Sequence, residues 1–127
     1  MAEGIFGTAI NCMDGRVQEP VNEWLKKHKG VDYVDEITEP GPIKALSEGD
    51  PVVSESIRNR VLISAGKHNS KIIAVIGHHD CAGNPLPKEE QVRQILKAIE
   101  VVRSWGTGAD VIGLYVNDKW DVEIVNE

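Results

Sequence analysis

The sequence predicts an α/β fold, with a mostly parallel sheet covered by helices on both faces and an antiparallel C-terminal edge strand. Two observations lead to this prediction. Short apolar segments of strand length alternate along the chain with longer segments of helical periodicity, a pattern typical of parallel sheets built from strand–helix–strand units. The last two apolar segments are separated by only a short polar turn, so the final strand must run antiparallel to the one before it.

Five segments have the composition of strands. Residues 7–11 and 71–77 are short apolar runs, which indicates strands buried within the sheet. Residues 31–37 alternate between apolar and polar side chains, as a strand with one buried face does. We expect the other two strands at residues 111–116 and 120–125, joined by a turn at residues 117–119.

Three segments between these strands have the apolar spacing of amphipathic helices, and we expect helices over residues 20–28, 50–68 and 87–105. Asp50 is a typical N-cap, with a proline after it in the first turn. Gly30 predicts the end of the first helix, because glycine accepts the left-handed conformation common at that position. Two prolines flank a glycine in residues 39–42, which we expect to form a loop. The apolar stripe of the third predicted helix comprises Val92, Ile95, Leu96, Ile99 and Val102.

Length and composition indicate one globular domain over residues 1–127. Apolar residues make up 41% of the chain and charged residues 27%, as in folded soluble proteins. The formal charge of -6 and the lack of a basic stripe argue against nucleic-acid binding, which relies on cations that neutralise phosphates. The sequence shows neither a secretory leader nor an apolar stretch of about 20 residues, so we expect a cytoplasmic protein without a membrane partner. In that reducing compartment two cysteines are more often ligands or nucleophiles than a disulfide.

Two polar segments carry the candidate chemistry. Residues 12–16 (CMDGR) follow the first predicted strand, and residues 77–83 (GHHDCAG) follow the strand at residues 71–77. Ligands of open α/β sheets bind beyond the carboxyl ends of the strands, where the winding order reverses. If these two strands are neighbours at that point, the polar side chains of both segments converge in one crevice.

The donor types in these segments favour zinc. We predict that Cys12, His78 and Cys81 bind one Zn²⁺ ion, since two thiolates and one imidazole form a donor set suited to it. Three protein ligands leave the fourth tetrahedral position for water or a carboxylate, as in catalytic sites. Asp14 could fill that position as a fourth ligand. Alternatively, a bidentate pair with Arg16 could hold Asp14 away from the metal.

The same two segments carry a family resemblance. Cys-x-Asp-x-Arg at residues 12–16, followed by His-x-x-Cys inside a Gly-His-x-x-Cys-x-Gly turn at residues 77–83, resembles the β-class carbonic anhydrase family, in a short, minimal form. The resemblance implies a mostly parallel four-stranded sheet with helices on both faces and an antiparallel C-terminal edge strand. It also implies zinc ligands at Cys12, His78 and Cys81, a catalytic Asp14–Arg16 dyad, and a homodimer or higher homo-oligomer.

The activity that the resemblance implies is that of a zinc lyase, the reversible hydration of carbon dioxide to bicarbonate by a zinc-bound hydroxide. Two alternatives stay open. Asp14 could close the coordination sphere and make the protein a non-catalytic zinc-binding or regulatory module. The site could instead hydrolyse a related small molecule such as carbonyl sulfide or carbon disulfide.

Two further polar residues lie within the second segment. We interpret His79 as a turn residue. We interpret Asp80 as an N-cap or as a hydrogen-bond acceptor that orients His78. A proton-shuttle role for this pair of residues is the alternative.

Overall fold

A computed structural model describes residues 3–127, so the first two residues of the expected domain 1–127 lie outside it. The chain forms one five-stranded sheet in the order β2-β1-β3-β4-β5. Within the described range no helix combines the length and the apolar character needed to cross a bilayer. The elements are β1 Phe6–Cys12, the 3-10 helix η1 Gly15–Val17, α1 Gln18–Lys29, β2 Tyr33–Glu39, α2 Pro42–Glu48, α3 Pro51–Lys67, β3 Ile72–His78, α4 Lys88–Arg103, β4 Asp110–Val116 and β5 Val122–Asn126.

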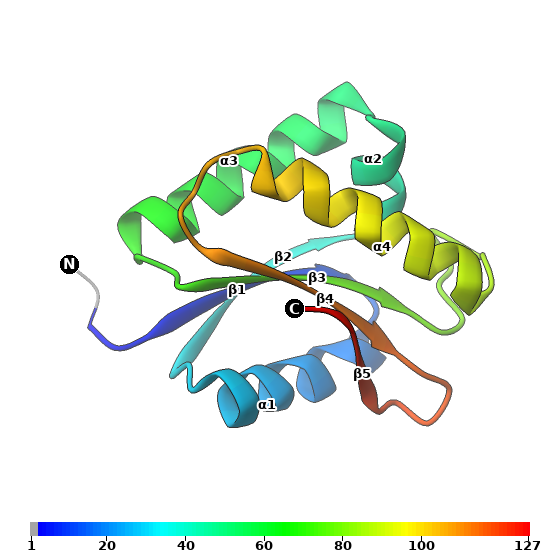
Figure 1. Cartoon of the computed structure of the whole chain (residues 1–127). Coiled ribbons are helices and arrows are strands. Elements are labelled where there is room, and N and C mark those ends of the chain that lie inside the picture. The colour runs from blue at the N-terminus through cyan, green and yellow to red at the C-terminus, as the bar shows by residue number, and fades with distance from the viewer. Residues whose placement is uncertain (1–2) are drawn as a thin grey trace.

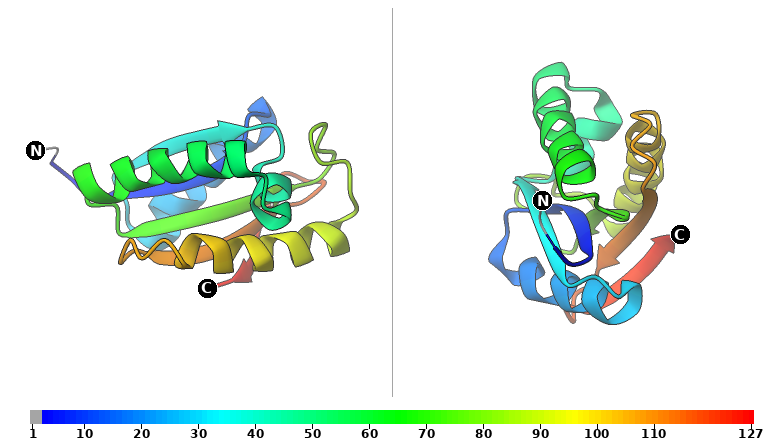
Figure 2. Two further views of the ribbon diagram at one scale, coloured as in Figure 1. Left: turned by 90° about the horizontal axis from the view of Figure 1, so that it is seen from above. Right: turned by 90° about the vertical axis from the view of Figure 1, so that its left-hand side faces the viewer.

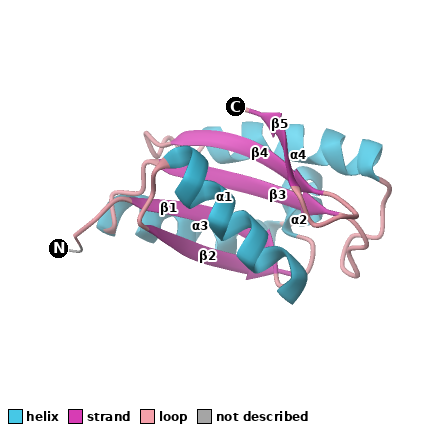
Figure 3. Ribbon diagram, turned by 90° about the horizontal axis from the view of Figure 1, so that it is seen from below, coloured by secondary structure: helices cyan, strands magenta, loops and turns pink. Residues whose placement is uncertain are grey.

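The sheet is parallel except at one edge. Strands β1 to β4 run parallel to one another, and β5 runs antiparallel to β4. Figure 3, viewed from below, shows the arrowheads of β1 to β4 pointing to the same edge of the sheet. The predicted fold class, a mostly parallel four-stranded sheet with an antiparallel C-terminal edge strand, is confirmed. The carboxyl ends of β1 and β3 therefore lie side by side, because these strands are neighbours at the centre of the sheet.

Helices cover both faces of the sheet. Figure 1 shows α2, α3 and α4 on one face and α1 on the other, and the view from above in Figure 2 shows α3 and α4 over different strands of the shared face. Ile57 of α3 and Ile95 of α4 pack with Ile73 of the sheet in one apolar core. Leu25 of α1 packs with Ile76 in the other. Burial of each such side chain contributes about 1.5–3 kcal/mol relative to its exposure.

Local sequence signals account for the ends of several helices. The Asp50 carboxylate accepts hydrogen bonds from the backbone N–H groups of Val52 and Val53, each at 3.0 Å, so its predicted role as an N-cap is confirmed. Gly30 follows α1 with φ 66°, a conformation that costs glycine little because it has no Cβ. Both signals depend only on neighbours in the sequence, which is why the sequence predicts them correctly.

Two sequence predictions are wrong. The expected loop at residues 39–42 is shorter, because Glu39 is the last residue of β2 and Pro42 the first of α2. A helix of seven residues is too short to show clear periodicity. On α4, Leu96 is 41% exposed although the sequence predicts it in the apolar stripe, whereas Gln91 is only 1% exposed. The helix is thus rotated to turn a polar side chain inward.

Candidate metal centre

The metal-ligand candidates lie where two central strands end. Cys12 is the last residue of β1 and His78 the last of β3. The sequence predicts that each follows its strand, so both strands are one residue longer at this end than predicted. The two strands pair through residues 8–10 and 73–75, and no pairing between them continues to their carboxyl ends. Cys81 follows His78 by three residues in a turn where Asp80 has φ 57°. The turn brings the second thiol back to the gap between the strands.

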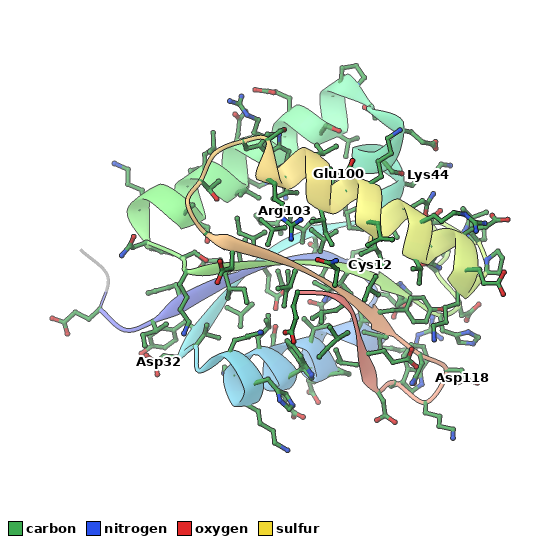
Figure 4. All side chains as sticks on the ribbon, in the orientation of Figure 1. Cys12, Asp32, Lys44, Glu100, Arg103 and Asp118 are labelled. Carbon is green, nitrogen blue, oxygen red and sulfur yellow. The ribbon has the colours of Figure 1, made fainter. Side chains whose placement is uncertain are left out.

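Three donor side chains converge in that gap. The ligand atoms of Cys12, His78 and Cys81 all lie within 4.8 Å of one another, and the three side chains are buried. Figure 4 labels Cys12 inside the molecular outline, away from the periphery where Asp118 lies in the β4–β5 turn. The two sulfur atoms are 3.8 Å apart. Two thiolates at 2.3 Å from a tetrahedral zinc ion would be separated by about 3.8 Å, so the spacing fits that metal.

The His78 imidazole has one nitrogen engaged and one without a partner. Its Nδ1 donates a hydrogen bond to the carbonyl oxygen of His79 at 2.7 Å, so Nε2 carries the lone pair. Among the described residues Nε2 of His78 is one of three buried side-chain N or O atoms without a hydrogen-bond partner. A buried acceptor left unpaired is costly, and a metal ion held with the two sulfurs would satisfy it. The arrangement could therefore hold a metal ion.

Proton sharing distinguishes the two thiols. The hydrogen bond from Cys81 lowers the pKa of Cys12, against the opposing effect of burial. The same bond and burial raise the pKa of Cys81. For His78, burial lowers the pKa, but the adjacent Cys12 sulfur and the His79 carbonyl raise it by more. Cys12 is thus the first of the two thiols to become a thiolate, the form that binds metals.

Asp14 and Arg16 form an ion pair beside this cluster. Asp14 is the N-cap of η1, and its Oδ1 accepts a hydrogen bond from the backbone N–H of Arg16 at 2.9 Å. The Arg16 guanidinium donates to both carboxylate oxygens, at 2.6 Å to Oδ2 and 3.1 Å to Oδ1. These bonds lower the pKa of Asp14 to about 2 and raise that of Arg16. Of the two arrangements that the sequence leaves open, the structure has the one in which Asp14 pairs with Arg16.

The interpretation of Asp80 as an N-cap or as the residue that orients His78 is wrong. The N-cap of the next helix is Pro87, and the partner of the His78 ring is the carbonyl of His79. Asp80 instead contacts Arg16, accepting hydrogen bonds at Oδ2 (3.2 Å) and at its backbone carbonyl (3.1 Å). Its left-handed backbone turns both acceptors towards Arg16, a partner 64 residues earlier that local sequence does not reveal.

Three residues around the site are not predicted from the sequence. Trp120 lies under the Arg16 guanidinium, which is 4.5 Å from the ring centroid, and His79 meets the same ring edge-on. Gln18 donates from Nε2 to the carbonyl oxygen of Cys12 at 2.6 Å. Gln91 hydrogen-bonds to the backbone of His78. The one available signal was a polar residue, Gln91, at a helix position that the apolar spacing places near the buried face.

The loops around the cysteines approach each other backbone to backbone. A Cβ on Gly83 would lie 2.6 Å from the carbonyl carbon of Pro40, and a Cβ on Gly41 would lie 2.7 Å from Cβ of Asn84. Gly41 also has φ +64°, which a side chain would strain. Backbone N–H groups of these loops help to lower the pKa of both cysteines. The glycines therefore let the loops close around the sulfur atoms.

A family model described as "Putative carbonic anhydrase" matches residues 2–126 of the chain. No curated protein sequence matches it significantly. Several solved structures have the same fold. One, the apo form of a carbon disulfide hydrolase, has a TM-score of 0.65 at 14% identity, with 94% of this chain and 78% of that chain covered.

Two carbonic anhydrase structures are similar as well. The β-carbonic anhydrase isoform I of Trichomonas vaginalis has a TM-score of 0.59 at 17% identity, and the match covers 94% of this chain and 81% of that one. The carbonic anhydrase of Glaciozyma antarctica has a TM-score of 0.60 at 12% identity, with 93% and 80% covered. At identities this low, the structural similarity establishes the shared fold alone.

Proposed function

The chain belongs to the carbonic anhydrase family, and from that premise we propose that it is a zinc-dependent lyase that reversibly hydrates carbon dioxide. The observation that carries this proposal is the convergence of Cys12, His78 and Cys81 around the unpaired Nε2 of the histidine. Cys12 Sγ, Cys81 Sγ and His78 Nε2 would hold the metal. Zinc with three protein ligands supplies, at its fourth position, an acidic water that acts as a nucleophile near neutral pH.

Asp14 would orient the nucleophile rather than store its proton. Its pKa of about 2 keeps the carboxylate ionised, so at neutral pH it can only accept hydrogen bonds. Arg16 holds both carboxylate oxygens and thereby prevents Asp14 from turning to the metal as a fourth ligand. This pairing favours an enzyme over the non-catalytic module, in which Asp14 would close the site.

Burial of the donors limits the substrate to a small molecule. Cys12, His78 and Cys81 are at most 4% exposed, so a substrate must be narrow to reach them. Linear carbon dioxide meets this condition, and so do carbonyl sulfide and carbon disulfide. The fold similarity to carbon disulfide hydrolase supports hydrolysis of such a molecule as the second candidate function.

We also propose a cytoplasmic homodimer. Two thiols whose sulfurs are 3.8 Å apart stay available for a metal only in a reducing compartment. Met13, between Cys12 and Asp14, is 64% exposed, and a second copy of the chain would cover such an apolar side chain at the rim of the site. Light scattering should give about twice the mass of the 127-residue chain.

Stopped-flow hydration of carbon dioxide tests the main proposal. Protein loaded with one equivalent of zinc should accelerate hydration above the buffer rate, and the Cys12→Ser variant should not. Parallel assays with carbon disulfide and carbonyl sulfide, monitored by release of hydrogen sulfide, test the second candidate. If the protein turned over a sulfur compound but not carbon dioxide, the second candidate function would replace the first. Zinc-loaded protein inactive on all three substrates would contradict both and support the non-catalytic module.

A further inference from the structure

We propose that Gln91 on α4 is a positioning residue for the metal centre, because its carboxamide fixes the backbone of His78 and thereby the direction of the imidazole. The proposal rests on the proposed function in one respect, that His78 binds the metal. Gln91 itself does not reach the metal-ligand atoms, and acts through the chain segment that carries one of them.

The side-chain amide of Gln91 makes the hydrogen bonds that a peptide group of a neighbouring strand would make. Its Oε1 accepts a hydrogen bond from the backbone N–H of His78 at 3.0 Å, and its Nε2 donates to the carbonyl oxygen of His78 at 2.8 Å. Nε2 also donates to the carbonyl of Leu86 at 3.1 Å. The side chain is 1% exposed, so water does not compete for these bonds. One amide thus holds both backbone groups of His78.

The end of β3 lacks a hydrogen-bonded strand on the β1 side, because β1 and β3 diverge before they end. The backbone N–H of His79 donates to Val116 on β4. Since successive residues of a strand direct their polar groups to opposite sides, those of His78 face the β1 side. There the β1–β3 pairing stops at Ile10 and Val75. The gap that makes room for the metal ligands therefore leaves His78 without a strand partner, and Gln91 takes its place.

Gly77 has no Cβ and so leaves space for the Gln91 amide beside the backbone of His78. A Cβ at position 77 would lie 2.7 Å from Oε1 of Gln91, and 2.9 Å and 3.0 Å from the terminal carbons of Ile43 and Ile95. The closest of these atoms is the far end of a flexible side chain, so a methyl group would displace the Gln91 amide first. Gly77 and Gln91 are thus a matched pair directly before the candidate ligand.

The position of the His78 backbone determines where Nε2 points. The ring is anchored to the chain through Nδ1, which donates to the carbonyl of the next residue, so a shift of this backbone moves the whole imidazole. The bond from Gln91 to Leu86 fixes, in addition, the loop that leads on from Cys81. Gln91 therefore stabilises the relative placement of two of the three donors.

Zinc affinity of purified protein, measured by competition with a chromophoric chelator, tests this role. Gln91→Met keeps the size of the side chain and removes its hydrogen bonds, and should weaken zinc binding by about tenfold or more, as loss of a residue that orients a ligand does. Ile99→Val on the same helix, which lowers the melting temperature without contacting His78, should change the affinity less than twofold. Equal losses in the two variants would make Gln91 a purely structural residue and overturn the proposal.

A double-mutant cycle gives a second test, which does not depend on the Gln91→Met variant. Gly77→Ala should weaken zinc binding in the wild-type background and have a smaller effect in Gln91→Ala, because the displaced amide is then absent and only the contacts with Ile43 and Ile95 remain. Additive effects of Gly77→Ala and Gln91→Ala would contradict the proposal.

Metal-free protein separates this inference from the proposed function. Nitrogen and proton NMR signals of the His78 amide and imidazole should shift in Gln91→Met but not in Ile99→Val. If wild-type protein bound no zinc, the proposed function would fail while these signals still tested the positioning role. Unchanged His78 signals in Gln91→Met would disprove it.

Discussion

The sulfur atoms of Cys12 and Cys81 lie 3.8 Å apart, although 69 residues separate them in the chain. The strand order places β1 next to β3, and the turn after β3 returns Cys81 to the end of β1. One proton shared between the two sulfurs in a hydrogen bond stabilises the first thiolate, and a second negative charge so close to it is disfavoured, so the pKa of Cys12 falls while that of Cys81 rises. A divalent cation would replace these protons and allow both sulfurs to be ionised.

We expect purified protein to contain about one zinc ion per chain, since the three donors form one closed set. The Cys12→Ser variant should lose most of it, because a hydroxyl is a poor substitute for a thiolate. Elemental analysis by mass spectrometry measures both. Ser104→Ala, on the surface at the end of α4, is the control and should retain the metal. Full zinc content in Cys12→Ser would contradict the ligand assignment.

Removal of the Trp120 ring should leave the Arg16 guanidinium less firmly positioned, because the guanidinium packs over this ring. An exposed cation–π contact contributes about 0.5–1 kcal/mol, so we expect kcat/KM to fall by roughly two- to fivefold in Trp120→Gly. Trp120 has φ 63°, and glycine relieves that backbone strain, so stability should fall less than in Trp120→Ala. Trp24→Ala, which contacts His28 and Lys29 but not Arg16, is the matched control. An unchanged rate in both Trp120 variants would exclude a role for the ring.

Gly83→Ala should damage the metal centre. Its Cβ would meet the Pro40 backbone at 2.6 Å, so the two loops must separate, at a cost of about 1–3 kcal/mol in unfolding free energy. Gly66→Ala within α3 meets nothing within 4 Å and should stabilise the helix by about 0.5–1 kcal/mol. Urea unfolding and zinc competition distinguish the variants. Zinc affinity that survives in Gly83→Ala would show that the loops can close without this contact.

The pH dependence of stability should report the ion pair that anchors β5. Lys88 and Asn117 donate hydrogen bonds to the Glu123 carboxylate, and these bonds lower its pKa. A carboxyl whose pKa is lowered by folding stabilises the protein above its unfolded pKa of about 4.3, and this contribution is lost as the pH falls through the lower, folded value. Glu123→Gln should therefore be less stable than wild type at pH 7, with the difference disappearing in acid.

Urea denaturation across this range measures the effect, with Glu89→Gln as the control on the exposed first turn of α4. A difference between Glu123→Gln and wild type that stays constant down to acid pH would assign the loss to packing instead of charge. Salt should reduce the difference at pH 7, because the pair is largely exposed to solvent.

The amino-acid sequence alone predicts the features that depend on neighbours in the chain. Apolar periodicity places the strands and long helices, Asp50 and Gly30 mark helix ends, and the short motifs at residues 12–16 and 77–83 identify the candidate ligands. The predicted parallel sheet then brings the ligands to one edge, because the carboxyl ends of parallel strands share it. These signals are strong since each is set within a few residues.

The partners of the polar side chains around the site follow from the folded chain. Asp80 and Trp120 meet Arg16 only after the β3 turn and the β4–β5 hairpin fold towards η1. Gln91 turns inward only because the strands diverge beside His78 and leave its peptide groups unpaired. A polar residue on an amphipathic helix ordinarily faces solvent. Its burial here is favourable because three hydrogen bonds replace those lost to water, and that balance exists only in the folded sheet.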